Sequence, residues 1–187
     1  IIHSERPPHD IHDIGGRQEI IQLWINTPSK NKMDVPAYFP LSAEEAPQIQ
    51  TGDSRVSGKV FSGEVLGVKG PIPSQAVVNA ATFEIKQGGR VSIPVPDTHN
   101  TLIYLLDGKV SVDGFGIVDG LHIVHFKNDG EGISLEAQAN TRVLFLSGEP
   151  LKEPVVSYGP FVMNNQTQIM EAMRDYQMGK MGVLLEE

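Results

Sequence analysis

The chain of 187 residues is long enough for one large domain or two small ones, and its 40% hydrophobic residues are typical of a globular protein. The absence of cysteine excludes disulfides, zinc–thiolate sites and thiol catalysis. A net charge of −8 opposes attraction to phosphate backbones and anionic lipids, so we expect no direct nucleic-acid partner and no membrane partner. Because no bilayer-length apolar run and no secretory signal are visible, we expect a cytoplasmic protein.

The first five residues, Ile-Ile-His-Ser-Glu, form an alternating pattern that suits an extended strand. Side chains two apart on a strand point to the same face, so His3 and Glu5 would look into one interior. Imidazole plus carboxylate suits non-haem iron, and zinc, nickel, copper and manganese are compatible with the same donors. The alternative is a strand end with two solvated polar groups. Since the chain starts inside this motif and without methionine, we expect it to be part of a longer protein.

The next stretch is predicted to be a loop followed by a strand. Prolines and glycines punctuate residues 6–16, which argues against a helix there. His9 and His12 have the spacing of metal ligands on a helix, but in a loop they are expected to be solvated. Residues 19–25 are rich in Ile, Leu and Trp and predict a strand. We expect Trp24 in the hydrophobic core or, alternatively, in the wall of a ligand cavity.

Prolines divide residues 26–53 into an extended connection without long elements. Alternation returns in residues 55–68 and predicts further strands, with glycines at bulges or bends. The sequence Lys-Gly-Pro-Ile-Pro-Ser of residues 69–74 is a second break, and we expect a domain boundary there.

Beyond this boundary, short-turn signals recur at hairpin spacing. They separate apolar segments and predict an antiparallel sandwich or barrel over residues 72–148. The signals are Gly88-Gly89, Asp107-Gly108, Asp113-Gly114, Asp119-Gly120 and Asp129-Gly130.

The carboxyl end changes to a helical period. We expect a helix over residues 166–178, capped at its start by Asn164 or Asn165 and closed by Gly179. Ile169, Met173 and Tyr176 fall on one helical face, which is expected to pack against the β-structure.

Two stretches near the end of the chain resemble a known family. The sequences SGEPLKEPV (residues 147–155) and YGPFVMN (158–164) resemble the carboxyl-terminal signature of the pirins, a branch of the cupin superfamily. Matches in the expected order include residues 2–6, 22–26 and 99–108, so the resemblance runs along essentially the whole chain.

The resemblance implies a mainly β fold of bicupin architecture, with two double-stranded β-barrels and one C-terminal α-helix. Residues 1–70 would be the remainder of the amino-terminal cupin barrel and the inter-domain connection. Residues 71–150 would form the whole carboxyl-terminal cupin barrel. Residues 151–187 would be a tail and helix packing across the barrels.

The resemblance also implies a role for the amino-terminal motif. In pirins an iron in the first cupin is held by a His-x-His pair and by a later His-x-Glu pair. His3 and Glu5 match the later pair, while the segment that should carry the earlier pair precedes Ile1. We therefore expect iron, or another divalent transition metal, on His3 and Glu5 in the intact protein. Two ligands rarely retain such a metal, so this chain alone need not hold it.

The second barrel does not follow the cupin metal motif. His99 is followed two residues later by Thr101, and the region that should carry a carboxylate reads Leu105-Leu106. His122 and His125 are three apart, which places them on opposite faces of a strand. We expect each of these two histidines to be hydrogen-bonded or solvated.

Two classes of function follow from the resemblance. The first is a quercetin 2,3-dioxygenase-like oxidoreductase, whose small aromatic substrate is a flavonol such as quercetin and in which Glu5 is both metal ligand and catalytic base. The second is a non-enzymatic, iron-containing and redox-responsive protein that binds a protein partner, either a transcription factor or a metabolic enzyme. The acidic surface is compatible with docking onto a basic protein. The sequence leaves both classes open.

Overall fold

The computed structural model describes residue 2 and residues 9–183. The fold is mainly β with one long carboxyl-terminal helix, as predicted. The described residues divide into two compact units, one of residues Tyr38–Leu151 and one of Ile1–Ala37 with Lys152–Glu187. No helix among the described residues has the length and apolar character needed to cross a membrane.

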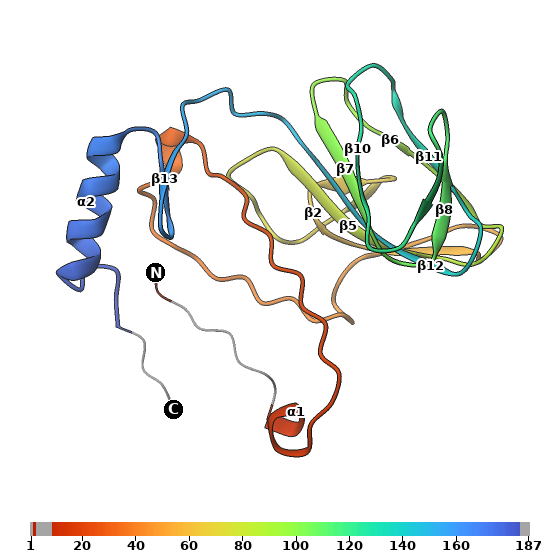
Figure 1. The fold of residues 1–187 in the computed structure, drawn as a ribbon, viewed down its shortest axis with the longest axis horizontal. Helices are drawn as coiled ribbons and strands as arrows, with labels where there is room; N and C mark the ends of the chain where they lie inside the picture. Colours follow the sequence, from red (N-terminus) through yellow and green to blue (C-terminus); the bar gives the residue numbers. More distant parts are fainter. Residues whose placement is uncertain (1, 3–8, 184–187) are drawn as a thin grey trace. The chain divides into compact units, whose positions relative to one another are not determined.

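The unit of residues Tyr38–Leu151 contains two large sheets and the small two-stranded sheet β3-β4, with every strand pairing antiparallel. The six-stranded sheet has the order β1-β2-β5-β12-β7-β10, and the four-stranded sheet has the order β6-β11-β8-β9. Figure 1 shows β2, β5, β7 and β12 facing β6, β8 and β11. The strands are β1 (Gln48–Gln50), β2 (Val56–Ser62), β3 (Glu64–Val65), β4 (Val68–Lys69), β5 (Val78–Ile85), β6 (Arg90–Pro94), β7 (Asn100–Asp107), β8 (Lys109–Val112), β9 (Gly116–Asp119), β10 (Ile123–His125), β11 (Gly132–Ala137) and β12 (Thr141–Gly148).

One hydrophobic core fills the space between these two sheets. β6 shows the alternation of inward apolar and outward polar side chains, with Val91 and Ile93 buried between exposed neighbours. Phe83 and Phe145 meet edge to face at its centre, with ring centroids 6.5 Å apart. The strands of the two sheets do not pair with each other in the described part of the chain. The result is a cupin-like sandwich rather than a barrel closed by hydrogen bonds.

All five predicted turns connect consecutive strands of this sandwich. Gly108, between β7 and β8, shows why glycine is needed at one of them, because its φ of 81° is a left-handed conformation. A Cβ atom at this position would also collide with the carbonyl oxygen of Asn140 and with Thr141. The local turn chemistry that the sequence displays therefore fixes where each strand ends.

The strands before residue 70 join the sheet of the strands after it. β2 pairs with β5 from Val56–Ile85 to Ser62–Ala80, and β1 extends the sheet beyond β2. Val56 and Val60 of β2 are fully buried in the common core. The assignment of residues 1–70 to a separate amino-terminal barrel stays a prediction.

The prediction of a loop over residues 6–16 is wrong for its second half. Residues His9–Ile14 form the short helix α1, which ends at Gly15, whose backbone N–H donates to the carbonyl of Ile11 at 3.0 Å. The prolines of this stretch precede the helix and its glycines follow it, and both positions are compatible with helix ends. The side chains of His9 and His12 are not among those that the structure describes.

The prediction of a strand over residues 19–25 is also wrong. None of the described strands pairs with this stretch, and a strand requires partners for its backbone N–H and C=O groups. Trp24 is 67% exposed rather than buried in a core. The 3₁₀ helix η1 (Ser29–Asn31) is the first regular element after it.

The carboxyl-terminal helix α2 (Gln166–Gln177) has the predicted caps. Asn165 accepts the backbone N–H of Gln168 through its side chain at 3.0 Å, and Gly179 has a φ of 72° just beyond the helix. The helix packs against the hairpin of β13 (Val156–Tyr158) and β14 (Phe161–Met163), beside which it lies in Figure 1.

The predicted apolar face of α2 is buried only in part. Ile169 is fully buried, whereas Met173 is half-buried. Tyr176 is 53% exposed and meets Phe161 edge to face, with ring centroids 6.2 Å apart.

Candidate functional site

The predicted metal ligands His3 and Glu5 lie outside the described residues. Their convergence on one interior therefore stays a prediction. The site that the structure does describe is in the sandwich, around His99 and Thr101.

His99 and Thr101 point into the sandwich from the start of β7. Both are buried, with exposed fractions of 7% and 4%. Leu105, four residues further along the same face, is fully buried in the apolar core. No group of three or more His, Asp or Glu side chains in the described ranges is arranged to hold a metal ion. The donors around His99 therefore do not fit a metal centre, because threonine and leucine stand where a cupin site would need ligands.

A row of polar side chains crosses three neighbouring strands at this end of the six-stranded sheet. Ser147 of β12 is directly opposite Asn79 of β5 on one side and Thr101 of β7 on the other. The next inward row of the same strands is wholly apolar and consists of Ala81, Phe145 and Ile103. The polar row, defined here as Asn79, Ser147, Thr101 and His99, thus ends the hydrophobic core.

Hydrogen bonds within the polar row engage one ring nitrogen of His99. The side-chain oxygen of Asn79 accepts the backbone N–H of Glu64 at 3.0 Å, so its amide nitrogen donates to Ser147 Oγ at 3.1 Å. Ser147 Oγ lies 3.2 Å from His99 Nδ1, and either of these two groups can be the donor. Nε2 is therefore the ring nitrogen of His99 that the polar row does not use.

The hydroxyl of Thr101 is buried and has no hydrogen-bond partner within the part of the chain that the structure describes. The backbone of the same residue is satisfied, since its carbonyl accepts the N–H of Phe126 at 3.0 Å. A buried hydroxyl without a partner is uncommon, because it loses its bonds to water without replacement.

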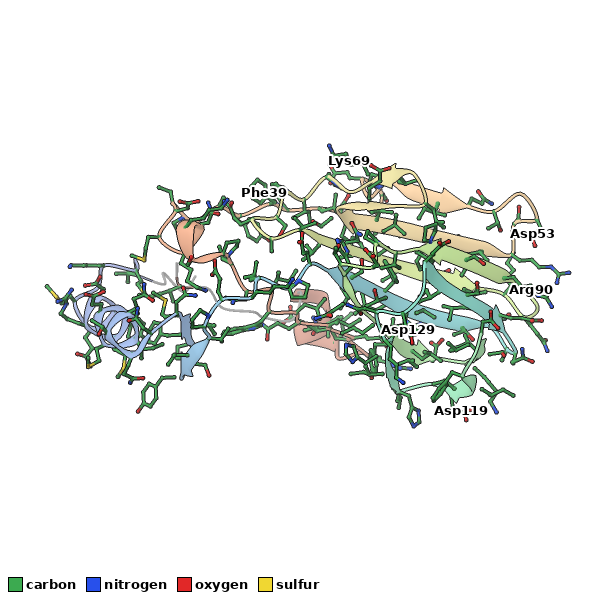
Figure 2. The ribbon with its side chains drawn as sticks, turned by 90° about the horizontal axis from the view of Figure 1, so that it is seen from above. Phe39, Asp53, Lys69, Arg90, Asp119 and Asp129 are labelled. Carbon is green, nitrogen blue, oxygen red and sulfur yellow. The ribbon has the colours of Figure 1, made fainter. Side chains whose placement is uncertain are left out.

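His99 and Thr101 line a cavity of about 200 Å³ at this end of the sandwich. Its walls include the loops that precede β7 and β11, with Asp97 on the first loop and Lys127 and Asp129 on the second. Figure 2 shows Asp129 away from the end of the sandwich that carries Asp53 and Arg90. The cavity combines an apolar wall with two buried hydrogen-bonding groups, as small-molecule sites do.

His122 and His125 do not line this cavity. As predicted, His122 is hydrogen-bonded, with Nδ1 3.1 Å from the carbonyl oxygen of Asp119 and 3.0 Å from that of Gly120. His125 is exposed to solvent.

The signature stretch near the carboxyl end makes structural contacts. Glu153 accepts the backbone N–H of Ser29 at 2.8 Å and its hydroxyl at 2.9 Å. Asn164 donates its amide to Glu153 at 3.2 Å and to the carbonyl of Pro154 at 2.9 Å. The pKa of Glu153 is lowered, chiefly by the backbone hydrogen bond from Ser29. This carboxylate therefore ties the segment around η1 to the carboxyl-terminal tail.

Reasoning from the sequence named His99 and Thr101 only as a departure from the cupin metal motif, and it missed Asn79 and Ser147. The available signal was a polar residue at an inward position of an otherwise apolar strand, as Ser147 is two residues after Phe145. Only the register of β5, β12 and β7 reveals that these side chains form one row.

Comparison with known proteins agrees with this architecture. The profile of the pirin C-terminal cupin domain matches residues 80–182. The chain is 35% identical to a pirin-like protein of Solanum lycopersicum over 97% of its own length and 61% of the relative's. It is 33% identical to pirin of Mus musculus, covering 97% of this chain and 62% of the mouse protein.

A solved structure extends the likeness to three dimensions. The crystal structure of quercetin 2,3-dioxygenase from Acinetobacter baumannii has a TM-score of 0.81 and 33% identity, over 87% of this chain and 56% of that one. The chain thus spans less than two thirds of the length of the curated relatives it matches. The domain match and the shared sandwich show that this chain belongs to the pirin family.

Proposed function

We propose that the intact protein is a metal-dependent dioxygenase of the quercetinase type that acts in an amino-terminal barrel. The supporting observation is the 33% identity, over 87% of the chain, with a structure described as quercetin 2,3-dioxygenase. The substrate would be a flavonol such as quercetin.

The residues expected to hold the metal are His3 and Glu5, together with two histidines upstream of this chain. An imidazole and a carboxylate fit the chemistry of non-haem iron, and two donors alone are too few to hold it. When bound, the metal would supply a Lewis acid and a template for substrate and dioxygen. The Glu5 carboxylate would take the proton of the flavonol hydroxyl, which requires a pKa suited to that transfer.

The test uses the longer protein that contains this chain, loaded with iron and supplied with quercetin in air. Loss of the quercetin absorbance reports turnover, and elemental analysis reports bound iron. We expect His3→Ala to lower iron content and turnover together, because removing one of four ligands weakens the site and disturbs the others.

His125→Ala is the matched control, since His125 is exposed on β10. It should leave iron content and turnover unchanged. Iron content that falls with His125→Ala and not with His3→Ala would overturn the assignment of the site.

The same experiment separates the two classes of function. Iron bound through His3 without quercetin turnover would contradict the dioxygenase. It would favour the alternative, an iron-containing regulatory protein that binds a transcription factor or a metabolic enzyme.

A further inference from the structure

We propose that the polar row of the carboxyl-terminal sandwich is a second binding site, free of metal, for a small uncharged hydroxylated molecule. The site is independent of His3 and Glu5 and of the function proposed above. It consists of the cavity lined by His99 and Thr101, together with the hydrogen bond between His99 and Ser147.

Thr101 supplies the first argument. Thr101 lines the cavity, and its hydroxyl is buried and finds no partner in the described ranges. Valine has nearly the same shape and would avoid the unfavourable desolvation of the hydroxyl. A threonine here is therefore explained by a bonding partner that enters the cavity.

His99 supplies the second argument. The hydrogen bond with Ser147 occupies Nδ1 and leaves Nε2 outside the polar row. An alcohol hydroxyl both donates and accepts, so it can bond to Nε2 in either tautomer and also to Thr101 Oγ1. A hydroxyl group thus satisfies both side chains at once.

The charges around the cavity disfavour an anionic ligand. Three carboxylates, of Asp97, Asp113 and Asp129, and one ammonium, of Lys127, line it. This excess of negative charge disfavours an anion. A metal ion is disfavoured because no three side chains in the described part of the chain form a ligand set.

The volume and the apolar lining of the cavity restrict the size and the chemistry of the ligand. Its volume of about 200 Å³ is below the range of about 300–1,000 Å³ for drug-sized ligands. Val95, Phe126 and Ile133 offer apolar contacts to a carbon skeleton. A polyol or a monosaccharide meets both requirements.

Matched probes test the charge preference. The full-length protein, labelled at its threonine methyl groups, is titrated with glucose, gluconate and glucosamine and with glycerol and glycerate, while the Thr101 resonance is followed by NMR. We expect glucose or glycerol to shift this resonance saturably and with higher affinity than its carboxylate counterpart. Much tighter binding of glucosamine than of glucose would mean that the ligand is a cation and would contradict the proposal of an uncharged one.

Matched variants test the role of the hydroxyl. Binding to the variants is measured by isothermal titration calorimetry, because the variants of Thr101 have no Thr101 resonance. Thr101→Val should weaken binding by about tenfold, the loss expected for a buried hydrogen bond, while the melting temperature is unchanged or raised. Thr101→Ser keeps the hydroxyl and should keep binding. If the valine variant fails to fold, loss of binding in Thr101→Ser would contradict the proposal. Thr98→Val is the control, because Thr98 is exposed and does not line the cavity.

Three results would overturn the proposal. If no uncharged probe shifts the Thr101 resonance, the hydroxyl serves only an ordered water. If gluconate or glycerate binds more tightly than its uncharged counterpart, the class of ligand is wrong. If Thr101→Val binds as well as the wild type, the polar row does not form the site. None of these results depends on iron or on quercetin turnover, so failure here is distinct from failure of the proposed function.

Discussion

The two compact units of this chain use apolar residues in different ways. In the unit of residues Tyr38–Leu151, apolar side chains from both sheets meet in one core. In the other unit, Ile169 is the one hydrophobic side chain, among those the structure describes, that is buried to the same degree. Residues 20–25 of that unit include Ile20, Leu23 and Trp24, which are 60%, 46% and 67% exposed.

This difference shows that an apolar sequence forms a core only where other strands cover it. β12 lies between β5 and β7, so its backbone is paired on both edges and its inward side chains are enclosed. Residues 20–25 are equally apolar, yet none of the described strands pairs with them. In the bicupin that the family resemblance implies, this run would be covered by an amino-terminal barrel, and that arrangement stays a prediction.

Phe145→Ala tests the hydrophobic core of the sandwich and should lower the free energy of unfolding more than any other substitution proposed here. Phe145 is 1% exposed and packs edge to face on Phe83, so truncation leaves a cavity at the centre of the core. We expect the free energy of unfolding to fall by about 3–5 kcal/mol. Urea denaturation followed by circular dichroism measures this change.

Phe115→Ala is the matched control, because Phe115 lies in the same unit but is 72% exposed. It should change the free energy of unfolding by at most about 0.5 kcal/mol. Equal losses for the two phenylalanines would show that the core described here does not carry the stability of the sandwich.

Ile169→Ala tests whether the other unit has a core of its own. Ile169 is fully buried where α2 packs on the β13–β14 hairpin. The substitution should lower the local stability of α2 by about 2–5 kcal/mol. Amide hydrogen exchange should show faster exchange in α2, β13 and β14, while β5, β7 and β12 keep their protection.

Met170→Ala is the control for this substitution, since Met170 is 57% exposed on the same helix. Its exchange pattern should match that of the wild type. Loss of protection throughout the sandwich on Ile169→Ala would contradict the division into two separately packed units.

The features of the fold that could be predicted from sequence are those set by local chemistry. The aspartate–glycine turns and the alternation of apolar residues placed the strands from β5 to β12, and Asn165 and Gly179 placed the ends of α2. The prediction of a strand over residues 19–25 was wrong because strand formation depends on a pairing partner, which the periodicity of the sequence does not reveal. α1 was missed because proline and glycine at helix ends were taken as evidence of a loop.

The candidate site was less predictable, because its parts come from three strands. The sequence predicted only that His99 and Thr101 do not follow the cupin metal motif, and the structure shows both side chains buried at the start of β7. Asn79 and Ser147 join them only through strand register, which short-range patterns do not encode. The hydrogen bond between Ser147 Oγ and His99 Nδ1 depends on the same register and could not be derived from residue types.

Glu153→Gln should have the smallest effect, because it addresses one polar contact within the unit of Ile1–Ala37 and Lys152–Glu187. The pKa of Glu153 is lowered, first by the backbone hydrogen bond from Ser29 and then by the Ser29 hydroxyl and Asn164. A group whose pKa is lower in the folded state contributes stability above its ordinary pKa, about 4.3 for glutamate. That contribution is lost as the pH falls through the lowered value.

We therefore expect exchange protection of the Ser29 amide to be highest near neutral pH and to fall on acidification through the titration of Glu153. In Glu153→Gln the protection should be lower at neutral pH and should lose this acid dependence, since the amide side chain bears no charge to titrate. Glu149→Gln is the matched control, because Glu149 is exposed in the same stretch and Glu153 remains intact. The protection of β5 and β12 should not follow this titration. Acid-dependent protection of Ser29 that survives in Glu153→Gln would mean that another group holds the segment around η1 to the carboxyl-terminal tail.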